Sequence, residues 1–303
     1  MPMKPLPATS PRPVSTRSAL GLHGGISLLA LGCVASMLAA CGGSPGAEIV
    51  EVYDCVLTNC KDSELLSTDA LSPHAVIRGE GNVLNISAQL GQSANLLTRV
   101  RLTGADRFFA QTSSQRIELR DSDGKGSSYT GSLTVSGEEP SLSIVLERRG
   151  EQHVNSVTLP KSFSVLAPVG PVNLGLKTGK LMINLGHASG SSVDNLSSLR
   201  CTRKDGSSFA GGRSDNYSLP FVIENVNGSP WVRINTTDLD LSLNQHSSSL
   251  DTNAPNTSPV QTCEIAVSWR VYRMGSTAST LSRHSTMRGE RAASQSISYD
   301  ARL

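Results

Sequence analysis

The feature that most constrains the fold of this chain is the regular alternation of its apolar residues. It is clearest in residues 263–271, where every second position is apolar: Cys263, Ile265, Val267, Trp269 and Val271. Successive side chains of a β-strand point to opposite faces, so a period of two predicts a strand with one buried face. No segment after residue 40 keeps an amphipathic helical period for three turns. The sequence therefore predicts an all-β fold, a sandwich or a barrel.

Further strand-like segments, separated by turn signals, fall into two groups. The first group predicts an N-terminal β domain over residues 51–160, with strands near 83–90, 98–103, 117–119, 129–135, 142–146 and 154–159. The second group predicts a C-terminal β domain over residues 161–303, with strands near 163–166, 181–185, 221–223, 232–234, 239–243 and 263–271. We therefore expect two consecutive β domains.

Two cysteines of the second group indicate its architecture. Cys201 and Cys263 lie 62 positions apart with Trp231 between them, a separation that could bridge the two sheets of an immunoglobulin-like sandwich. In antibody-type domains the buried tryptophan follows the first cysteine more closely than Trp231 does. The spacing predicts an immunoglobulin-like sandwich for residues 161–303 and leaves homology to antibody domains open.

The amino-terminal segment has the parts of a secretory signal. Basic residues at Lys4, Arg12 and Arg17 precede an apolar run over residues 26–38. This run has thirteen residues, too few for a permanent helix across a hydrocarbon core of about 30 Å. We therefore expect residues 1–40 to be a signal peptide that is removed.

The end of this segment predicts a lipid anchor. Leu38 and the small residues Ala39 and Ala40 form the segment that a signal peptidase recognises, and Cys41 supplies a thiol for lipidation. The stretch resembles a bacterial lipobox, and Cys41 would then become the acylated, palmitate-bearing first residue, with residues 41–50 as a flexible tether. A transmembrane anchor, or an ordinary signal with an incidental cysteine, is the alternative. Because Gly42 and not aspartate follows Cys41, the resemblance implies the outer membrane.

Export would deliver four further cysteines to an oxidising compartment. Four cysteines allow three pairings. We predict the disulfides Cys55–Cys60 and Cys201–Cys263. A redox-active dithiol is the alternative for Cys55 and Cys60, although that chemistry normally uses two intervening residues and not four. No histidine stands at zinc-ligand spacing from either pair, so no metal site is predicted.

Three short stretches are similar to a family of uncharacterised two-domain proteobacterial lipoproteins. They are Leu102-Thr103-Gly104-Ala105-Asp106-Arg107, the junction Ser156-Val157-Thr158-Leu159-Pro160-Lys161-Ser162-Phe163, and the Cys263 strand with the later Ser296-Ile297-Ser298. The resemblance covers most of residues 95–303. It implies two consecutive β domains and supplies no catalytic residue.

Two loop motifs carry residues that occur in functional sites. Asp121-Ser122-Asp123-Gly124 resembles the start of a calcium loop but lacks a closing glutamate, so a hairpin turn is predicted. His187 and Ser189 lie together in Gly186-His187-Ala188-Ser189-Gly190, which is not a nucleophile elbow and predicts a solvent loop.

The remaining candidates are histidines and arginines outside these motifs. The histidines His74, His153, His246 and His284 are expected on the surface. A basic cluster, Arg273, Arg283, Arg288 and Arg291, could meet lipid phosphates or an anionic polysaccharide, or could belong to a solvated hairpin loop over residues 274–291.

Charge and composition limit the partners. Removal of residues 1–40 changes the formal net charge from +2 to −1, which gives no electrostatic reason to expect nucleic acid. With Phe 5, Tyr 5 and Trp 2, mostly at strand positions, stacked recognition of sugar rings is disfavoured. We expect a non-enzymatic envelope lipoprotein, without cofactor, that binds or supports an envelope protein or polysaccharide. The alternative is a membrane-tethered periplasmic hydrolase of an envelope polymer that uses dispersed acidic residues or histidines.

Overall fold

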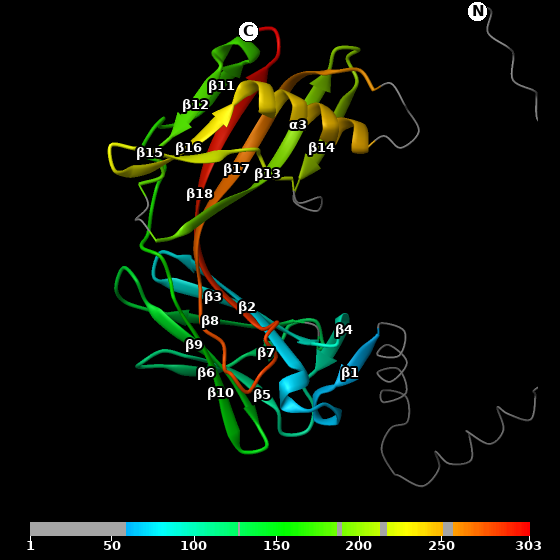
Figure 1. Cartoon of the computed structure of the whole chain (residues 1–303), viewed down its shortest axis with the longest axis vertical. Helices are drawn as coiled ribbons and strands as arrows, with labels where there is room; N and C mark the ends of the chain where they lie inside the picture. Colours follow the sequence, from blue (N-terminus) through cyan, green and yellow to red (C-terminus); the bar gives the residue numbers. More distant parts are fainter. Residues whose placement is uncertain (1–58, 127, 187–189, 213–216, 251–256) are drawn as a thin grey trace, which may run out of the picture. The chain divides into compact units, whose positions relative to one another are not determined.

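Strands dominate the computed structural model, which describes residues 59–126, 128–186, 190–212, 217–250 and 257–303 (Figure 1). The all-β prediction is confirmed for this part of the chain. Its helices are α3 (Thr236–Ser249) and the short 3-10 turns η2 (Ser63–Leu65), η3 (Thr68–Ala70) and η4 (Leu176–Thr178). None of the described helices is long and apolar enough to cross a bilayer.

The largest sheet has eleven strands among the described residues. Its main path runs β1-β4-β3-β2-β18-β17-β13-β14, and β7, β8 and β11 pair at its sides. The strands are β1 (Cys60–Asp62), β2 (Leu71–Glu80), β3 (Val83–Gln92), β4 (Asn95–Arg101), β7 (Arg120–Asp121), β8 (Tyr129–Thr134), β11 (Val172–Gly175), β13 (Ser192–Arg203), β14 (Ser208–Gly212), β17 (Val260–Met274) and β18 (Thr286–Asp300).

Two smaller sheets complete the described structure. The four-stranded sheet has the order β10-β9-β5-β6, and the three-stranded sheet has the order β12-β16-β15. Their strands are β5 (Arg107–Gln111), β6 (Arg116–Glu118), β9 (Ser141–Arg148), β10 (Glu151–Thr158), β12 (Lys180–Ile183), β15 (Val222–Val226) and β16 (Ser229–Asn235). Each smaller sheet contributes side chains to a different hydrophobic core together with strands of the large sheet.

The first core joins the large sheet to the four-stranded sheet. Ile77 and Leu84 of the large sheet belong to the same buried cluster as Phe108 and Ile144 of the smaller one. Leu281, which lies in the loop between β17 and β18, is also buried in this cluster. The first core therefore includes residues far beyond 160, and the boundary expected between residues 160 and 161 stays a prediction.

The second core joins the large sheet to the three-stranded sheet and α3. Leu199 and Ile265 are buried with Ile183 and Val232, so two sheets enclose a common interior, as in an immunoglobulin-like sandwich. Trp269 is fully buried in this core. Burial of a side chain of this kind stabilises the fold by roughly 1.5–3 kcal/mol relative to exposure.

The alternation predicted for residues 263–271 is confirmed in β17. All five predicted inward residues are buried: Cys263, Ile265, Val267, Trp269 and Val271. β17 pairs with β13 on one side and β18 on the other, so its backbone is satisfied on both edges. Sequence period and sheet register agree along this strand.

The strand predicted at residues 239–243 is wrong, because these residues lie in α3. Leu239 and Leu243 are buried whereas Leu241 is exposed, as a helical period requires. The buried face also contains Thr236 and Ser247. The prediction counted only apolar residues, so it took three alternating leucines for one strand face and missed the polar members of the helical stripe.

The disulfide Cys201–Cys263 is present, but its predicted position between two sheets is wrong. The two cysteines are direct partners on the antiparallel neighbours β13 and β17 of the large sheet. Their Cα atoms lie 4.1 Å apart. A separation of 62 residues suits neighbouring strands as well as facing sheets, so spacing alone could not distinguish the two arrangements.

Candidate functional site

The face of the large sheet opposite the buried residues of β17 presents a row of polar side chains across six strands. The register aligns neighbours from β13 to β8: Ser192, Tyr272, Glu290, Arg78, Asn85 and Ser132. Directly paired residues point to the same face of a sheet, so these side chains share one surface. We call this surface the polar face. Figure 1 shows β13, β17, β18, β2, β3 and β8, the strands that carry it.

A network of ion pairs crosses the centre of the polar face. Glu290 is almost fully buried, with its side chain 3% exposed, and it binds two arginines through separate oxygens. Arg78 Nε lies 2.7 Å from Glu290 Oε1, and Arg288 Nε lies 2.7 Å from Oε2. The hydrogen bond from Arg78 and the nearby positive charge of Arg288 together offset the cost of burying this carboxylate.

The network continues from Arg288 to Asp194 and Arg270. Arg288 Nη2 and Arg270 Nε lie 2.8 and 2.6 Å from the two carboxylate oxygens of Asp194. The Arg288 guanidinium also stacks 3.8 Å above the centre of the Tyr272 ring. Three arginines therefore share two carboxylates, so the network itself carries one positive charge in excess.

A shallow depression of about 460 Å³ lies beside the network on β2, β3 and β8. Arg78 stands at its edge with a side chain 57% exposed. The other outward side chains that line it are Val76, Asn85, Ser87, Thr130 and Ser132. Within the described part of the chain, no hydrogen bond engages the side chains of these four polar residues. Their hydroxyl and amide groups are available to a ligand.

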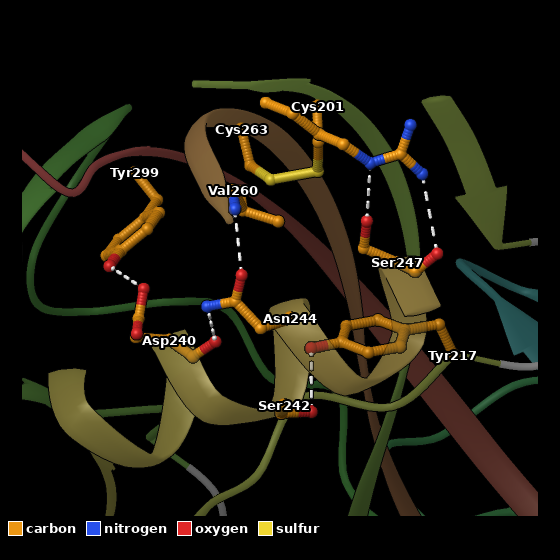
Figure 2. Close-up of a disulfide and its surroundings, with 10 residues drawn as sticks. Cys201, Tyr217, Asp240, Ser242, Asn244, Ser247, Val260, Cys263 and Tyr299 are labelled. Carbon is orange, nitrogen blue, oxygen red and sulfur yellow. Dashed lines mark hydrogen bonds between the residues drawn. A yellow bond between two sulfur atoms is a disulfide. The ribbon is translucent and has the colours of Figure 1, made fainter. Parts of the chain in front are cut away.

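The side chains of the disulfide are buried, and Figure 2 shows them with the hydrogen bonds of the neighbouring residues. Cys201 and Cys263 are 3% and 2% exposed. Tyr299 donates to Asp240 Oδ1 over 2.6 Å, and burial raises the pKa of the Tyr299 phenol. Asn244 of α3 accepts from the backbone N–H of Val260 over 2.8 Å.

An arginine and a tyrosine attach the rest of α3. Arg203 donates to Ser247 Oγ over 2.8 Å and reaches the Ser247 carbonyl in the last turn, where a cation also complements the helix dipole. The phenol of Tyr217 bonds Ser242 over 3.0 Å, and burial raises the pKa of Tyr217. These contacts hold α3 against the sheet. A depression of about 500 Å³ on β13, β14 and β17 is lined in part by Cys201 and Cys263.

The structure separates the four arginines expected to form a basic cluster. Arg273 Nη2 pairs with Glu139 at 2.7 Å, and Arg288 belongs to the network of the polar face. Arg291 is buried and donates to the carbonyl oxygens of Pro160 and Gly81, where burial lowers the pKa of its guanidinium. Arg283 is exposed. The solvated hairpin loop over residues 274–291 is also wrong, because β18 begins at Thr286.

The predicted surface position of the histidines is wrong for His153. Its side chain is buried, with Nδ1 2.7 Å from Thr280 Oγ1. The other three, His74, His246 and His284, are half-buried. Scattered polar neighbours in the sequence did not indicate burial, because the covering residues come from the distant loop between β17 and β18.

The predicted turn at Asp121 is confirmed. The Asp121 carboxylate accepts the backbone N–H groups of Asp123, Gly124 and Gly126 at 3.2, 3.1 and 2.8 Å. The aspartate therefore closes its own loop between β7 and β8, as Asx turns do. Among the residues that the structure describes, no group of three or more histidines, cysteines, aspartates or glutamates could hold a metal ion.

Several predicted site residues lie outside the described residues. These are the signal and lipidation residues Leu38, Ala39, Ala40 and Cys41, the loop residues His187 and Ser189, and Cys55. Cys60 begins β1. The pairing Cys55–Cys60 and the lipidation of Cys41 therefore stay predictions.

Sequence reasoning missed the residues at the centre of the polar face. Arg78 and Glu290 are 212 positions apart, and they meet because β2 and β18 pair in parallel. The available signal was the charge of Arg78 between the buried Ile77 and Gly79, which marks the outward side of β2. This pattern shows that Arg78 lies on the outward face of β2, but it does not show that Glu290 is its partner.

Comparison with known proteins gives no family. No family model matches the chain, and no curated protein matches it. Among solved structures, the Escherichia coli adhesin FdeC is similar at 13% identity and a TM-score of 0.22, over 76% of this chain and 64% of that one. A chimeric titin Z1Z2 tandem is similar at 9% identity and a TM-score of 0.18, over 72% of this chain and 94% of that one. The chain thus spans less than two thirds of the adhesin chain, and both TM-scores are too low to support a functional argument.

Proposed function

We propose that this protein is a lipid-anchored lipoprotein of the bacterial cell envelope that acts by binding, without catalysis, through the polar face. The anchor rests on Leu38, Ala39, Ala40 and Cys41, whose order is that of a lipobox. The lipid at Cys41 would hold the chain at the outer membrane, and the tether over residues 41–50 would separate the β-strand body from the lipid.

The polar face is the observation that carries the binding role. Buried Glu290 fixes Arg78 and Arg288 in place, so this surface presents cationic groups at set positions. Preorganised side chains lose less conformational entropy on binding than free ones. The strands beneath the face belong to the cores, so the surface is also held from below. A rigid surface of this kind suits recognition of a polymer or another envelope protein.

Acyl labelling combined with fractionation tests the anchor. Cells that express the chain are grown with radiolabelled palmitate, and the wild type is compared with Cys41→Ser. We expect label and outer-membrane fractionation for the wild type and neither for the variant. A matched variant, Cys33→Ser, should keep both, because Cys33 lies inside the segment expected to be removed. Equal labelling of wild type and Cys41→Ser would contradict the proposed anchor.

Crosslinking from the polar face tests the binding role. A photo-reactive residue at Ser132 should give a discrete crosslinked product in intact cells, whereas the same residue at Ser207, beyond β13, should not. Identical product patterns from the two positions would contradict a role for this face.

A further inference from the structure

We infer that the depression beside Arg78 binds a carboxylate-bearing polysaccharide. This inference rests on the proposed function, since it names the ligand class of the same polar face. Arg78 has N–H groups that are not used in the bond to Glu290. Its Nε is bound to Glu290, which leaves the edge formed by its two Nη atoms directed away from that bond. The side chain is 57% exposed, and no hydrogen bond or ion pair among the described residues engages its Nη atoms.

The open edge of a guanidinium matches a carboxylate. Two parallel N–H groups can donate to both oxygens of one carboxylate, which gives direction as well as charge complementarity. The lining of the depression contains no acidic side chain. Arg78 is the single charged side chain in this lining, and Glu80, two positions along β2 on the same face, lies outside it. The depression therefore favours an anionic ligand.

The rest of the lining matches a sugar. Asn85 and Ser132 are direct partners on β3 and β8, as are Ser87 and Thr130 one step along the strands. These four side chains place amide and hydroxyl groups in two adjacent rows around Arg78. Such groups donate to and accept from sugar hydroxyls. Val76 is the single apolar side chain among the outward residues that line the depression, whereas peptide recognition usually needs several apolar pockets. An acidic sugar polymer fits this combination best.

Polar contacts take the place of ring stacking at this site. No aromatic side chain lines the depression. Tyr272 lies in the same row as Arg78, but its ring is covered by the Arg288 guanidinium. Recognition would therefore depend on charge and hydrogen bonds, and it should weaken as salt screens the arginine.

Binding to immobilised polygalacturonate tests the inference, with dextran as the uncharged control. The full acylated chain is used in non-ionic detergent. We expect saturable binding to polygalacturonate, none to dextran, and at least fivefold weaker binding for Arg78→Gln. Arg283→Gln removes the same charge from an exposed position outside the depression and should change affinity by less than twofold.

Two further variants separate recognition by hydrogen bonds from attraction by charge. The double variant Asn85→Ala with Ser132→Ala leaves the charge unchanged and should weaken binding about threefold. Glu80→Gln removes an acidic group two positions from Arg78 on the same strand face and should strengthen binding. Equal effects of Arg78→Gln and Arg283→Gln, or equal binding to dextran, would overturn the inference. So would a wild-type chain that binds neither polymer, and that result would leave the palmitate and crosslinking tests of the proposed function standing.

Discussion

Removal of the Cys201–Cys263 disulfide should destabilise the second core by an amount that can be worked out from its loop. The bond closes a loop of 62 residues in the unfolded chain. On the chain-entropy model, such a closure contributes about 4 kcal/mol at 25 °C. Because both sulfurs are buried, the double variant Cys201→Ala with Cys263→Ala loses this constraint and a little packing.

Urea unfolding followed by tryptophan fluorescence measures this effect selectively. The two tryptophans of the chain, Trp231 and Trp269, lie in β16 and β17, beside or within the second core. With a denaturant slope of about 2 kcal/mol per molar urea, a loss of about 4 kcal/mol lowers the unfolding midpoint by about 2 M. Either single substitution should give nearly the same shift as the pair, since each one removes the bond.

A matched control is Ser198→Ala, which changes an outward residue of the same strand as Cys201. Its free energy of unfolding should stay within about 0.5 kcal/mol of the wild-type value, so the urea midpoint should hardly move. A midpoint shift below about 0.5 M for the double variant would refute the loop argument. It would mean that the pairing of β13 with β17 already restricts the unfolded chain.

Three other perturbations test separate parts of the fold. Gly211→Ala places a Cβ against His246 Nε2 and should lower the free energy of unfolding by about 1–3 kcal/mol. The same change in a His246→Ala background should lower it less, and urea midpoints measure both effects. Burial lowers the pKa of His74 below its ordinary value of 6.5, so the unfolded chain binds more protons than the folded chain below that pH. The free energy of unfolding should therefore fall as the pH is lowered from 7 to 5. The fall should be less steep in His74→Asn. Asp106→Ala removes the carboxylate that lies 3.2 Å from the buried Arg148 guanidinium. This should lower the free energy of unfolding by about 3–5 kcal/mol, measured by circular dichroism.

Each of these three predictions has an outcome that would contradict it. Equal costs of Gly211→Ala in both backgrounds would show that the helix histidine is not the obstacle. A flat stability profile for the wild type below pH 6.5 would contradict the depressed pKa of His74. An Asp106→Ala variant as stable as the wild type would mean that Arg148 finds another acceptor, for example more contact with the Leu66 carbonyl to which it already donates.

The sequence was most informative where one strand face is apolar throughout. The register of β17 follows directly from its alternation, and the strands at residues 129–135, 142–146 and 154–159 lie close to β8, β9 and β10. It was misleading where polar residues are buried, as with Thr236 and Ser247 in α3. A count of apolar positions cannot detect such a helix.

The candidate site was less accessible to sequence reasoning than the fold. Arg288 was noted as part of a basic cluster, but its partners Asp194 and Glu290 make it one element of an ion-pair network. These partners meet through pairing between strands that are distant in the chain. The sequence gives the number of charged residues. The pairing of the strands determines which of them form ion pairs with one another and which can contact a ligand.

Mass spectrometry of the amino terminus of the protein isolated from its native membrane tests the lipid anchor most directly. We expect a peptide that begins at residue 41 and carries acyl chains on the cysteine. An intact leader over residues 1–40, or an unmodified thiol at Cys41, would contradict it.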